Sequence, residues 1–188
     1  NTSLPNPSTI KAGIRCDGTL VLHQGAMDIG QGANTVISQV FATALGVSVH
    51  QLQLVGADTD VTPDAGKTSA SRQTYVSGSA ARLSGEALRA DILKRVNASN
   101  TASLEVSNGV IRVSDGASAH EIALSALEPN NDGYVLTAQE TYDPPTKPLD
   151  ENGQGIPYAQ FGYAAQLVVV EVDTALGPVK PCLFYTSP

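Results

Sequence analysis

The sequence predicts an α+β fold in which mixed sheets pack against helices. Some stretches carry apolar residues at the spacing of one helix face, and others alternate at the spacing of a strand. The two kinds of segment follow one another without the regular strand–helix–strand repetition of a parallel sheet. The chain has 188 residues, of which 41% are hydrophobic, so it suits one domain, or two tightly joined lobes, with an ordinary core.

The first half of the chain predicts three strands and one helix. In chain order these are the strands 10–15 and 19–22, the helix 34–45 and the strand 51–55. Asp17 and Gly18 form the dipeptide of a tight hairpin turn between the first two strands. In the helix the apolar residues fall on one face, and Gly46 supplies a left-handed cap after the last turn.

The second half predicts a long helix, a second hairpin, a short helix and two more strands. These are the helix 75–96, the strands 103–106 and 110–113, a helix from 118 to about 127, and the strands 133–141 and 163–172. Ser118 and Glu121 have the spacing of a capping box, which favours the short helix. Gly78 and Gly85 weaken the long helix by about 1 kcal/mol each relative to Ala, so we expect another backbone to pack closely there. The proline-rich residues 143–148 predict an extended loop.

The charge of the chain argues against nucleic acid as a partner. With 11 basic and 18 acidic residues the net charge is −7, and no basic cluster is present to neutralise phosphates. No apolar run approaches the roughly 18 residues of a membrane span. The N-terminus has neither a starting Met nor the apolar segment of a signal peptide, so we expect a piece of a longer protein. We expect that protein to be cytoplasmic, with the periplasm as the alternative.

The residues that commonly ligate metals show no ligand pattern in this sequence. We interpret the two widely separated cysteines, Cys16 and Cys182, as structural thiols. The three histidines also lack a paired spacing; they are His23, His50 and His120. Asp58 and Asp60 suggest calcium, but the glycine and glutamate of an EF-hand loop are missing from the required positions. We therefore interpret this stretch as a solvated turn.

Two polar segments, each just ahead of a predicted helix, are the candidate binding loops. A helix start offers unpaired N–H groups and a partial positive charge, so two such starts suit the two ends of a long anionic cofactor. The first segment contains Gly30, Gln31 and Gly32. A dinucleotide-binding fingerprint would need Gly or Ala at position 35, where Thr35 stands, so a plain structural turn remains the alternative.

The second segment contains Ser69, Ala70, Ser71, Arg72, Gln73 and Thr74. Residues 66–68, Gly-Lys-Thr, look like the end of a P-loop, but Val61 replaces the partner glycine, which argues against a P-loop ATPase. Arg72 offers a donor fork for a phosphate or a planar heterocycle, with an exposed Arg at an ordinary helix start as the alternative. We predict that Gly32 and Ala70 face a common cleft, in which Arg72 reaches an anion.

The order of the polar motifs along the chain is more specific than any one of them. They are Met-Asp-Ile-Gly-Gln-Gly at 27–32, Asn-Thr at 34–35, Gly-Ala-Asp-Thr-Asp-Val-Thr-Pro at 56–63, Thr-Ser-Ala-Ser-Arg-Gln at 68–73, Tyr-Asp-Pro-Pro-Thr at 142–146, Gly-Gln-Gly at 153–155 and Glu-Val-Asp-Thr at 171–174. This succession resembles the second molybdenum-cofactor-binding domain of the molybdenum hydroxylases, the xanthine dehydrogenase and aldehyde oxidoreductase family. The resemblance covers residues 1–180 as part of that domain. Residues 181–188 do not continue it, and we interpret them as a foreign or irregular tail.

The resemblance implies an enzyme that binds molybdopterin cytosine dinucleotide and hydroxylates an aldehyde or N-heterocycle with oxygen from water. Electrons would pass to iron–sulfur clusters and to a flavin or another acceptor, so the implied partners are the rest of the large subunit, an iron–sulfur subunit and a flavin subunit. By position, Gly30, Gln31 and Gly32 would contact the pterin or phosphate portion of the cofactor. Ser69 and Ala70 match the small residues closest to molybdenum and substrate. The cradle would be completed by Ser71, Arg72, Gln73 and Thr74.

The chain also departs from the family pattern. The family's general base is a glutamate in a Gly-x-Gly-Glu segment, which is absent from these 188 residues, as are the cysteine sets for iron–sulfur clusters. We therefore expect the chain to be a catalytically inactive part of an active enzyme. The alternative is a non-catalytic structural or interaction module that kept the fold without the cofactor. A nucleotide-binding module of another kind would rest only on the Gly-x-Gly of the first segment and on Lys67 and Thr68.

Overall fold

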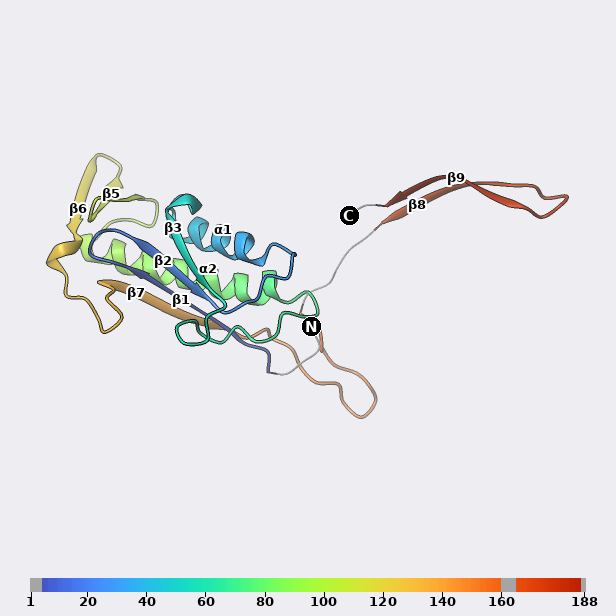
Figure 1. The fold of residues 1–188 in the computed structure, drawn as a ribbon, viewed down its shortest axis with the longest axis horizontal. Coiled ribbons are helices and arrows are strands. Elements are labelled where there is room, and N and C mark those ends of the chain that lie inside the picture. Colours follow the sequence, from blue (N-terminus) through green and yellow to red (C-terminus); the bar gives the residue numbers. More distant parts are fainter. Residues whose placement is uncertain (1–4, 160–164, 187–188) are drawn as a thin grey trace.

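The computed structural model describes residues 5–159 and 165–186, and it confirms the predicted α+β class (Figure 1). The main body consists, in chain order, of β1 (Ser8–Ile14), β2 (Leu20–Gln24), α1 (Ala33–Leu45), β3 (Leu52–Gly56), α2 (Gln73–Val96) and β7 (Leu136–Tyr142). A smaller sheet contains β4 (Ser103–Ser107), β5 (Val110–Asp115) and β6 (Ser118–Ala123), and a separate hairpin contains β8 (Gln166–Val172) and β9 (Val179–Thr186). Short 3-10 helices lie at Val49–Gln51 and Leu124–Ala126. No helix in the described part of the chain combines the length and apolar character that crossing a membrane requires.

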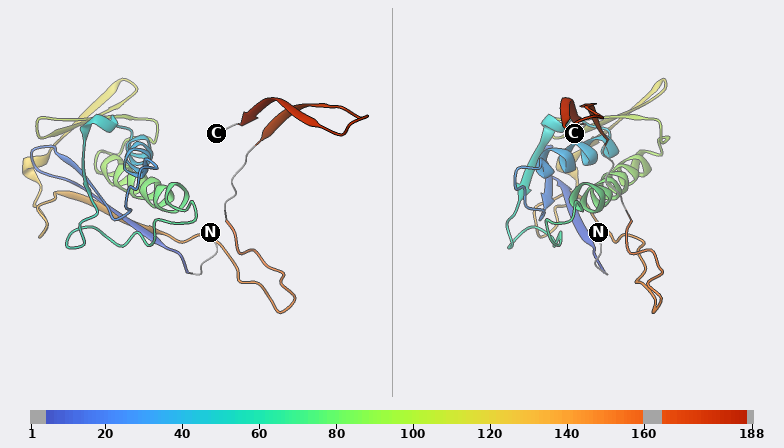
Figure 2. Two further views of the ribbon diagram at one scale, coloured as in Figure 1. Left: turned by 45° about the vertical axis from the view of Figure 1, so that its right-hand side comes forward. Right: turned by 90° about the vertical axis from the view of Figure 1, so that its right-hand side faces the viewer.

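The main sheet has the strand order β3-β2-β1-β7, and both long helices pack against it (Figures 1 and 2). β1 is antiparallel to β2 and β7, whereas β3 lies parallel to β2 after the crossover through α1. The buried apolar side chains of α1 form one face; four of them recur every four positions, Ala33, Ile37, Phe41 and Leu45, and Ala42 lies beside them. This face joins the strand side chains of Ile10 and Leu22 in one core.

The two glycines of α2 have different surroundings. A Cβ atom at Gly85 would lie 2.8 Å from the Cβ of Ala44 and 2.9 Å from the carbonyl oxygen of Phe41, both in α1. Gly85 thus permits the close helix–helix contact that its sequence position predicts. At Gly78 a Cβ would meet nothing within 4 Å among the described residues, so the expected close backbone is absent there.

The helix predicted at 118–127 is wrong, because residues Ser118–Ala123 form strand β6 and only Leu124–Ala126 makes a helical turn. Gly116, with φ of 61°, makes the tight turn from β5 into β6. Glu121 lies opposite Arg112 on the neighbouring strand. Instead of capping a helix, its Oε1 atom forms an ion pair with Nη2 of Arg112 at 2.8 Å. The capping-box spacing was therefore outweighed by cross-strand pairing.

The β8–β9 hairpin stands away from the main body (Figures 1 and 2). The strand predicted at 163–172 is described from Gln166 onward, and its first residues lie outside the described ranges. Residues 181–186 belong to β9, which pairs antiparallel with β8, so they are regular up to Thr186, and the foreign origin of the tail stays a prediction. Apolar side chains of the hairpin are exposed, Leu167 and Val179 among them.

His23, near the end of β2, is buried, and the charges that act on it are those of Lys11, Asp132 and Arg15. Its Nε2 atom hydrogen-bonds the hydroxyl of Tyr134 at 2.6 Å, and its Nδ1 atom has no partner in the described part of the chain. Burial, and next the charge of Lys11, lower the pKa of His23 below its usual value. The neutral imidazole is therefore the form that the fold accommodates.

We expect Gly85→Ala and Gly78→Ala to change stability in opposite directions. The added methyl at position 85 collides with α1 and should lower the free energy of unfolding by about 1–3 kcal/mol. At position 78 the methyl meets open space, so the gain in helix propensity should raise it by about 0.5–1 kcal/mol. Urea denaturation of both variants checks this, and equal effects would contradict the assigned packing.

We expect the stability of the protein to fall as the pH drops below about 6.5, the ordinary pKa of histidine. There the unfolded chain binds a proton at His23 that the folded chain, with its lowered pKa, does not bind. The contribution of neutral His23 to the free energy of unfolding is fully present above about pH 6.5. It is lost as the pH falls toward the pKa of His23 in the folded chain. Denaturation across this range should give a smaller decline for His23→Gln, whereas the exposed control His50→Gln should keep the wild-type decline.

Candidate functional site

The two candidate loops lie together at the start of α2. We call residues 25–32 the first loop and residues 57–72 the second loop. A cavity of about 400 Å³ is lined by Ile29 and Gln31 of the first loop and by residues 68–74 around the start of α2. Ala70 lines this cavity as predicted, but the first loop contributes Gln31 rather than the neighbouring Gly32. The common cleft therefore exists, with a different residue on one side.

Thr68 joins the two loops directly. Its hydroxyl donates to the carbonyl oxygen of Met27 at 3.0 Å and accepts from the amide of Met27 at 3.1 Å. It also accepts from the Gln73 side-chain amide at 3.3 Å. Thr68 was not among the predicted site residues, since its partners are distant in sequence.

The start of α1 already holds an anion supplied by the chain. The Asp28 carboxylate accepts hydrogen bonds from the amides of Gly30 at 2.9 Å, Gly32 at 3.3 Å and Asn34 at 3.1 Å. These bonds, with Asn34 contributing most, hold the pKa of Asp28 below its usual value. Two amides of this helix start, those of Gly32 and Asn34, are therefore already bound to a carboxylate of the chain, and binding of a ligand phosphate here stays a prediction. An Asp placed two residues before Gly30 is a capping signal that the sequence does contain.

The first loop is shaped by its own side chains and presents bare backbone outward. Gln31 accepts from the Ile29 amide at 2.7 Å and donates to the Met27 carbonyl at 3.2 Å, so its amide group spans the loop. Gly30 and Gly32 adopt left-handed φ values of 100° and 79°, and a Cβ at either would meet nothing within 4 Å among the described residues. A ligand can approach this backbone closely.

The start of α2 is open: unlike that of α1, it has no carboxylate hydrogen-bonded to its amides among the described residues. It has no side-chain cap and no acidic residue in its first turn. The amides of Gln73 and Thr74 have no hydrogen-bond acceptor within the ranges that the structure describes. Ala70 and Ser71 just before it are left-handed, with φ of 51° and 54°, a conformation that costs non-glycine residues about 1–2 kcal/mol each. The open donors and strained, exposed small residues make this the part of the cavity suited to an anion.

Arg72 does not point its donor fork at the cavity. Its Nη1 atom donates to the carbonyls of Ala65 and Lys67, the latter at 2.9 Å. Its Nη2 atom donates to the carbonyls of Asn6 at 3.1 Å and Pro7 at 2.8 Å. The side chain is only 2% exposed, and burial lowers its pKa. Backbone carbonyls therefore occupy both terminal nitrogens, while the buried Nε has no partner in the described part of the chain, and contact of Arg72 with an anion stays a prediction.

Gln73 is a second buried support beneath the loop. Its side-chain nitrogen donates to the carbonyl of Lys67 at 3.0 Å as well as to Thr68, and its oxygen accepts from the hydroxyl of Ser77. Ser77 in turn shares a 2.7 Å hydrogen bond with Ser8 on β1. A buried polar chain thus runs from the main sheet to the second loop.

The nine predicted cofactor-binding residues divide by burial. The exposed ones are Gly30, Gln31, Ser69, Ala70, Ser71 and Thr74, while Gly32 is half-buried and Arg72 and Gln73 are buried. Contact of these residues with a cofactor stays a prediction. For Arg72 and Gln73 the structure indicates support of the loop by their side chains.

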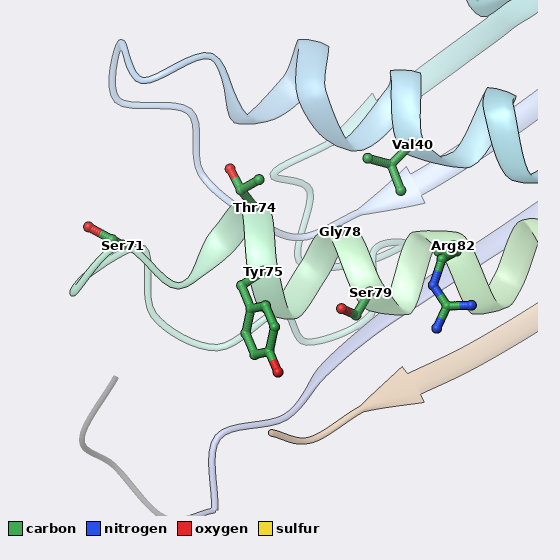
Figure 3. Close-up of a pocket in the computed structure, with 7 residues that line it drawn as sticks. All are labelled: Val40, Ser71, Thr74, Tyr75, Gly78, Ser79 and Arg82. Carbon is green, nitrogen blue, oxygen red and sulfur yellow. The ribbon is translucent and has the colours of Figure 1, made fainter. Parts of the chain in front are cut away.

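A second, more open cavity of about 370 Å³ runs along α2 and reaches Val40 of α1 (Figure 3). It shares Ser71 and Thr74 with the first cavity and continues past Tyr75 and Gly78. The hydroxyl of Tyr75 lies 2.9 Å from that of Tyr142, and this bond raises the pKa of Tyr142 to about 12. Among the described residues there is no cluster of three or more His, Cys, Asp or Glu that could hold a metal ion.

Comparison with known proteins identifies one family. Residues 1–186 match the family model of the molybdopterin cofactor-binding domain. The sequence is 44% identical to a xanthine dehydrogenase molybdenum-binding subunit of Escherichia coli over 78 residues. This alignment covers 41% of the present chain and 10% of the Escherichia coli subunit. Over 94% of this chain it is 25% identical to a xanthine dehydrogenase of Oryza sativa, of which it covers 12%.

Solved structures show the same fold. The aldehyde oxidoreductase of Desulfovibrio gigas superposes with a TM-score of 0.65 at 22% identity, covering 97% of this chain and 18% of that one. A copper- and molybdenum-containing CO dehydrogenase superposes with a TM-score of 0.61 at 21% identity, covering 95% and 22%. The chain therefore spans about a fifth or less of the proteins it is similar to.

We expect Arg72→Met to destabilise the protein, because it leaves the backbone carbonyls of Asn6, Pro7 and Ala65 without their donor; the Lys67 carbonyl keeps the bond from Gln73. The free energy of unfolding should fall by roughly 2–4 kcal/mol. Lys67→Met, an exposed change in the same loop, should stay within about 0.5 kcal/mol of wild type. Chemical denaturation measures both, and a wild-type value for Arg72→Met would show that the carbonyl contacts are dispensable.

Proposed function

The chain belongs to the molybdopterin cofactor-binding domain family, and from this premise we propose that it forms one wall of the cofactor site in a larger molybdenum hydroxylase. We assign residues 1–180 to the second cofactor-binding domain of the large subunit. The remaining partners proposed are the rest of that subunit, an iron–sulfur subunit and a flavin subunit. The cytoplasmic location stays a prediction.

The single observation that carries the proposal is the open start of α2 beside the first loop. A molybdopterin cofactor is large and carries phosphate, and phosphate is bound well by unpaired amides at a helix start. The amides of Gln73 and Thr74 are of this kind, and no acidic side chain competes in the first turn. The chain's own residues therefore fit the phosphate-bearing part of such a cofactor.

The lining of the cavity also suits a bulky group. Ser69, Ala70 and Ser71 have small, exposed side chains, so the backbone behind them is accessible. The glycine backbone of the first loop, at Gly30 and Gly32, supports an equally close approach from the other side. In this proposal these residues hold and orient the cofactor, and the cytosine dinucleotide form remains the expectation from the resemblance.

When bound, the cofactor would supply the molybdenum centre at which an aldehyde or N-heterocycle is hydroxylated with oxygen from water. Ser69 and Ala70 are the residues we propose to lie closest to that centre. The sequence lacks the Gly-x-Gly-Glu segment of the family's general base, so we propose that this residue comes from another part of the enzyme. This chain contributes binding and orientation.

The alternative, a module that kept the fold without the cofactor, is not favoured. Such a module would gain stability from a capping side chain at the start of α2 and from relief of the left-handed Ala70 and Ser71. The chain instead keeps an uncapped helix start and two strained residues at the cavity. Strain of this kind persists where a function requires it.

We expect the complete enzyme to contain molybdenum and to release cytidine monophosphate on acid hydrolysis, both in amounts comparable with the protein. Ser69→Phe should lower both, since the ring would fill the cavity. Ser118→Phe, at an exposed serine of β6, is the matched control and should leave both unchanged. Elemental analysis and nucleotide chromatography make the measurement. A wild-type enzyme without either component would favour the structural module.

A further inference from the structure

We propose that Thr68 is a positioning residue that sets the spacing between the two cofactor loops. The inference rests on the proposed function, because it supposes one ligand that contacts both loops. A hydroxyl has one proton and two acceptor lone pairs. In Thr68 the proton goes to the Met27 carbonyl, and the lone pairs accept from the Met27 amide and the Gln73 side chain. The group has no capacity left for a ligand, so it acts through the loops that it joins.

Thr68 is the point through which the loops are connected. In the part of the chain that the structure describes, every hydrogen bond between residues 25–32 and residues 57–72 uses the Thr68 hydroxyl. Within the first loop, the Met27 carbonyl also accepts a hydrogen bond from Gln31, which lines the cavity. At the start of α2, Gln73 donates to Thr68 and accepts from Ser77, and Ser77 is hydrogen-bonded to Ser8 of β1. One hydroxyl therefore couples the first loop to the core through the second.

Each loop keeps its own shape by other means. Asp28 and Gln31 organise the first loop from within it. The carbonyls around Arg72 hold the second loop against the N-terminal segment. Loss of the Thr68 hydroxyl would thus leave two folded loops that still pack together where Gly25 meets Pro63 and Ala65, but that are no longer hydrogen-bonded to each other beside the cavity. A ligand that spans both would suffer more than the fold itself.

The test uses three variants of the complete enzyme. Thr68→Val keeps the size and β-branching but removes the hydroxyl, and Thr68→Ser restores the hydroxyl. Thr62→Val is the matched control, because Thr62 is also half-buried in the second loop but donates locally to the Asp58 carbonyl. For each protein, the rate of molybdenum loss during dialysis and the melting temperature of the cofactor-free form are measured.

We expect Thr68→Val to lose molybdenum about tenfold faster than wild type, equivalent to ~1.4 kcal/mol in the barrier to loss. Thr68→Ser and Thr62→Val should keep the wild-type rate, and the cofactor-free melting temperatures of Thr68→Val and Thr62→Val should match. A wild-type rate in Thr68→Val would overturn the inference. So would a faster loss that Thr68→Ser does not rescue, or a fall in cofactor-free melting temperature confined to Thr68→Val. If wild type itself holds no molybdenum or cytidine monophosphate, the proposed function fails, and the inference fails with it.

Discussion

The buried guanidinium of Arg72 is the interaction on which the site depends. It gathers the carbonyls of the N-terminal segment, at Asn6 and Pro7, and of the second loop, at Ala65 and Lys67, around one charge. Burying a charge without partners is very unfavourable. Moving these carbonyls away would leave the guanidinium in that state, so the hydrogen bonds hold the carbonyls in place. Gly66, whose Cβ would lie 3.0 Å from the guanidinium, lets the loop wrap this closely. The left-handed Ala70 and Ser71 can persist because the chain on both sides of them is anchored.

The two helix starts at the cavity are electrostatically different although their sequences look alike. At α1 the chain supplies the anion itself, since Asp28 accepts from three amides. At α2 the chain supplies a cation below the first turn, Arg72, and no acidic residue within that turn. The helix dipole therefore favours an anion there, and the guanidinium adds a positive charge that Asp64 and Asp143 partly offset. A ligand phosphate would be favoured at the start of α2 and opposed by Asp28 at the start of α1, so the cavity has a defined polarity.

Periodicity along the sequence predicts the parts of this fold that depend on local pattern. The helices α1 and α2 and the hairpin of β4 and β5 were predicted because their apolar spacing and turn residues are local signals. Strand β6 was not, since the spacing of Ser118 and Glu121 also fits a capping box, and only its neighbour β5 decides between them. The proximity of the two loops was likewise predicted. The hydroxyl that joins them was not, because Thr68 and Met27 are 41 residues apart.

Polarity in a motif is a poor guide to ligand contact, and Ser71-Arg72-Gln73 shows why. Arg72 and Gln73 are the two residues of this motif with the greatest hydrogen-bonding capacity, and both are buried with their terminal groups bound to the chain. Ser71, which offers least, is the one exposed at the cavity. Energetics explains which residues of the motif are buried. A backbone that holds left-handed residues next to open amides needs strong hydrogen-bond donors inside the loop. A bulky ligand, in turn, needs small side chains on the exposed side of the loop. A binding loop of this kind therefore places its most polar side chains inside and leaves recognition to the backbone.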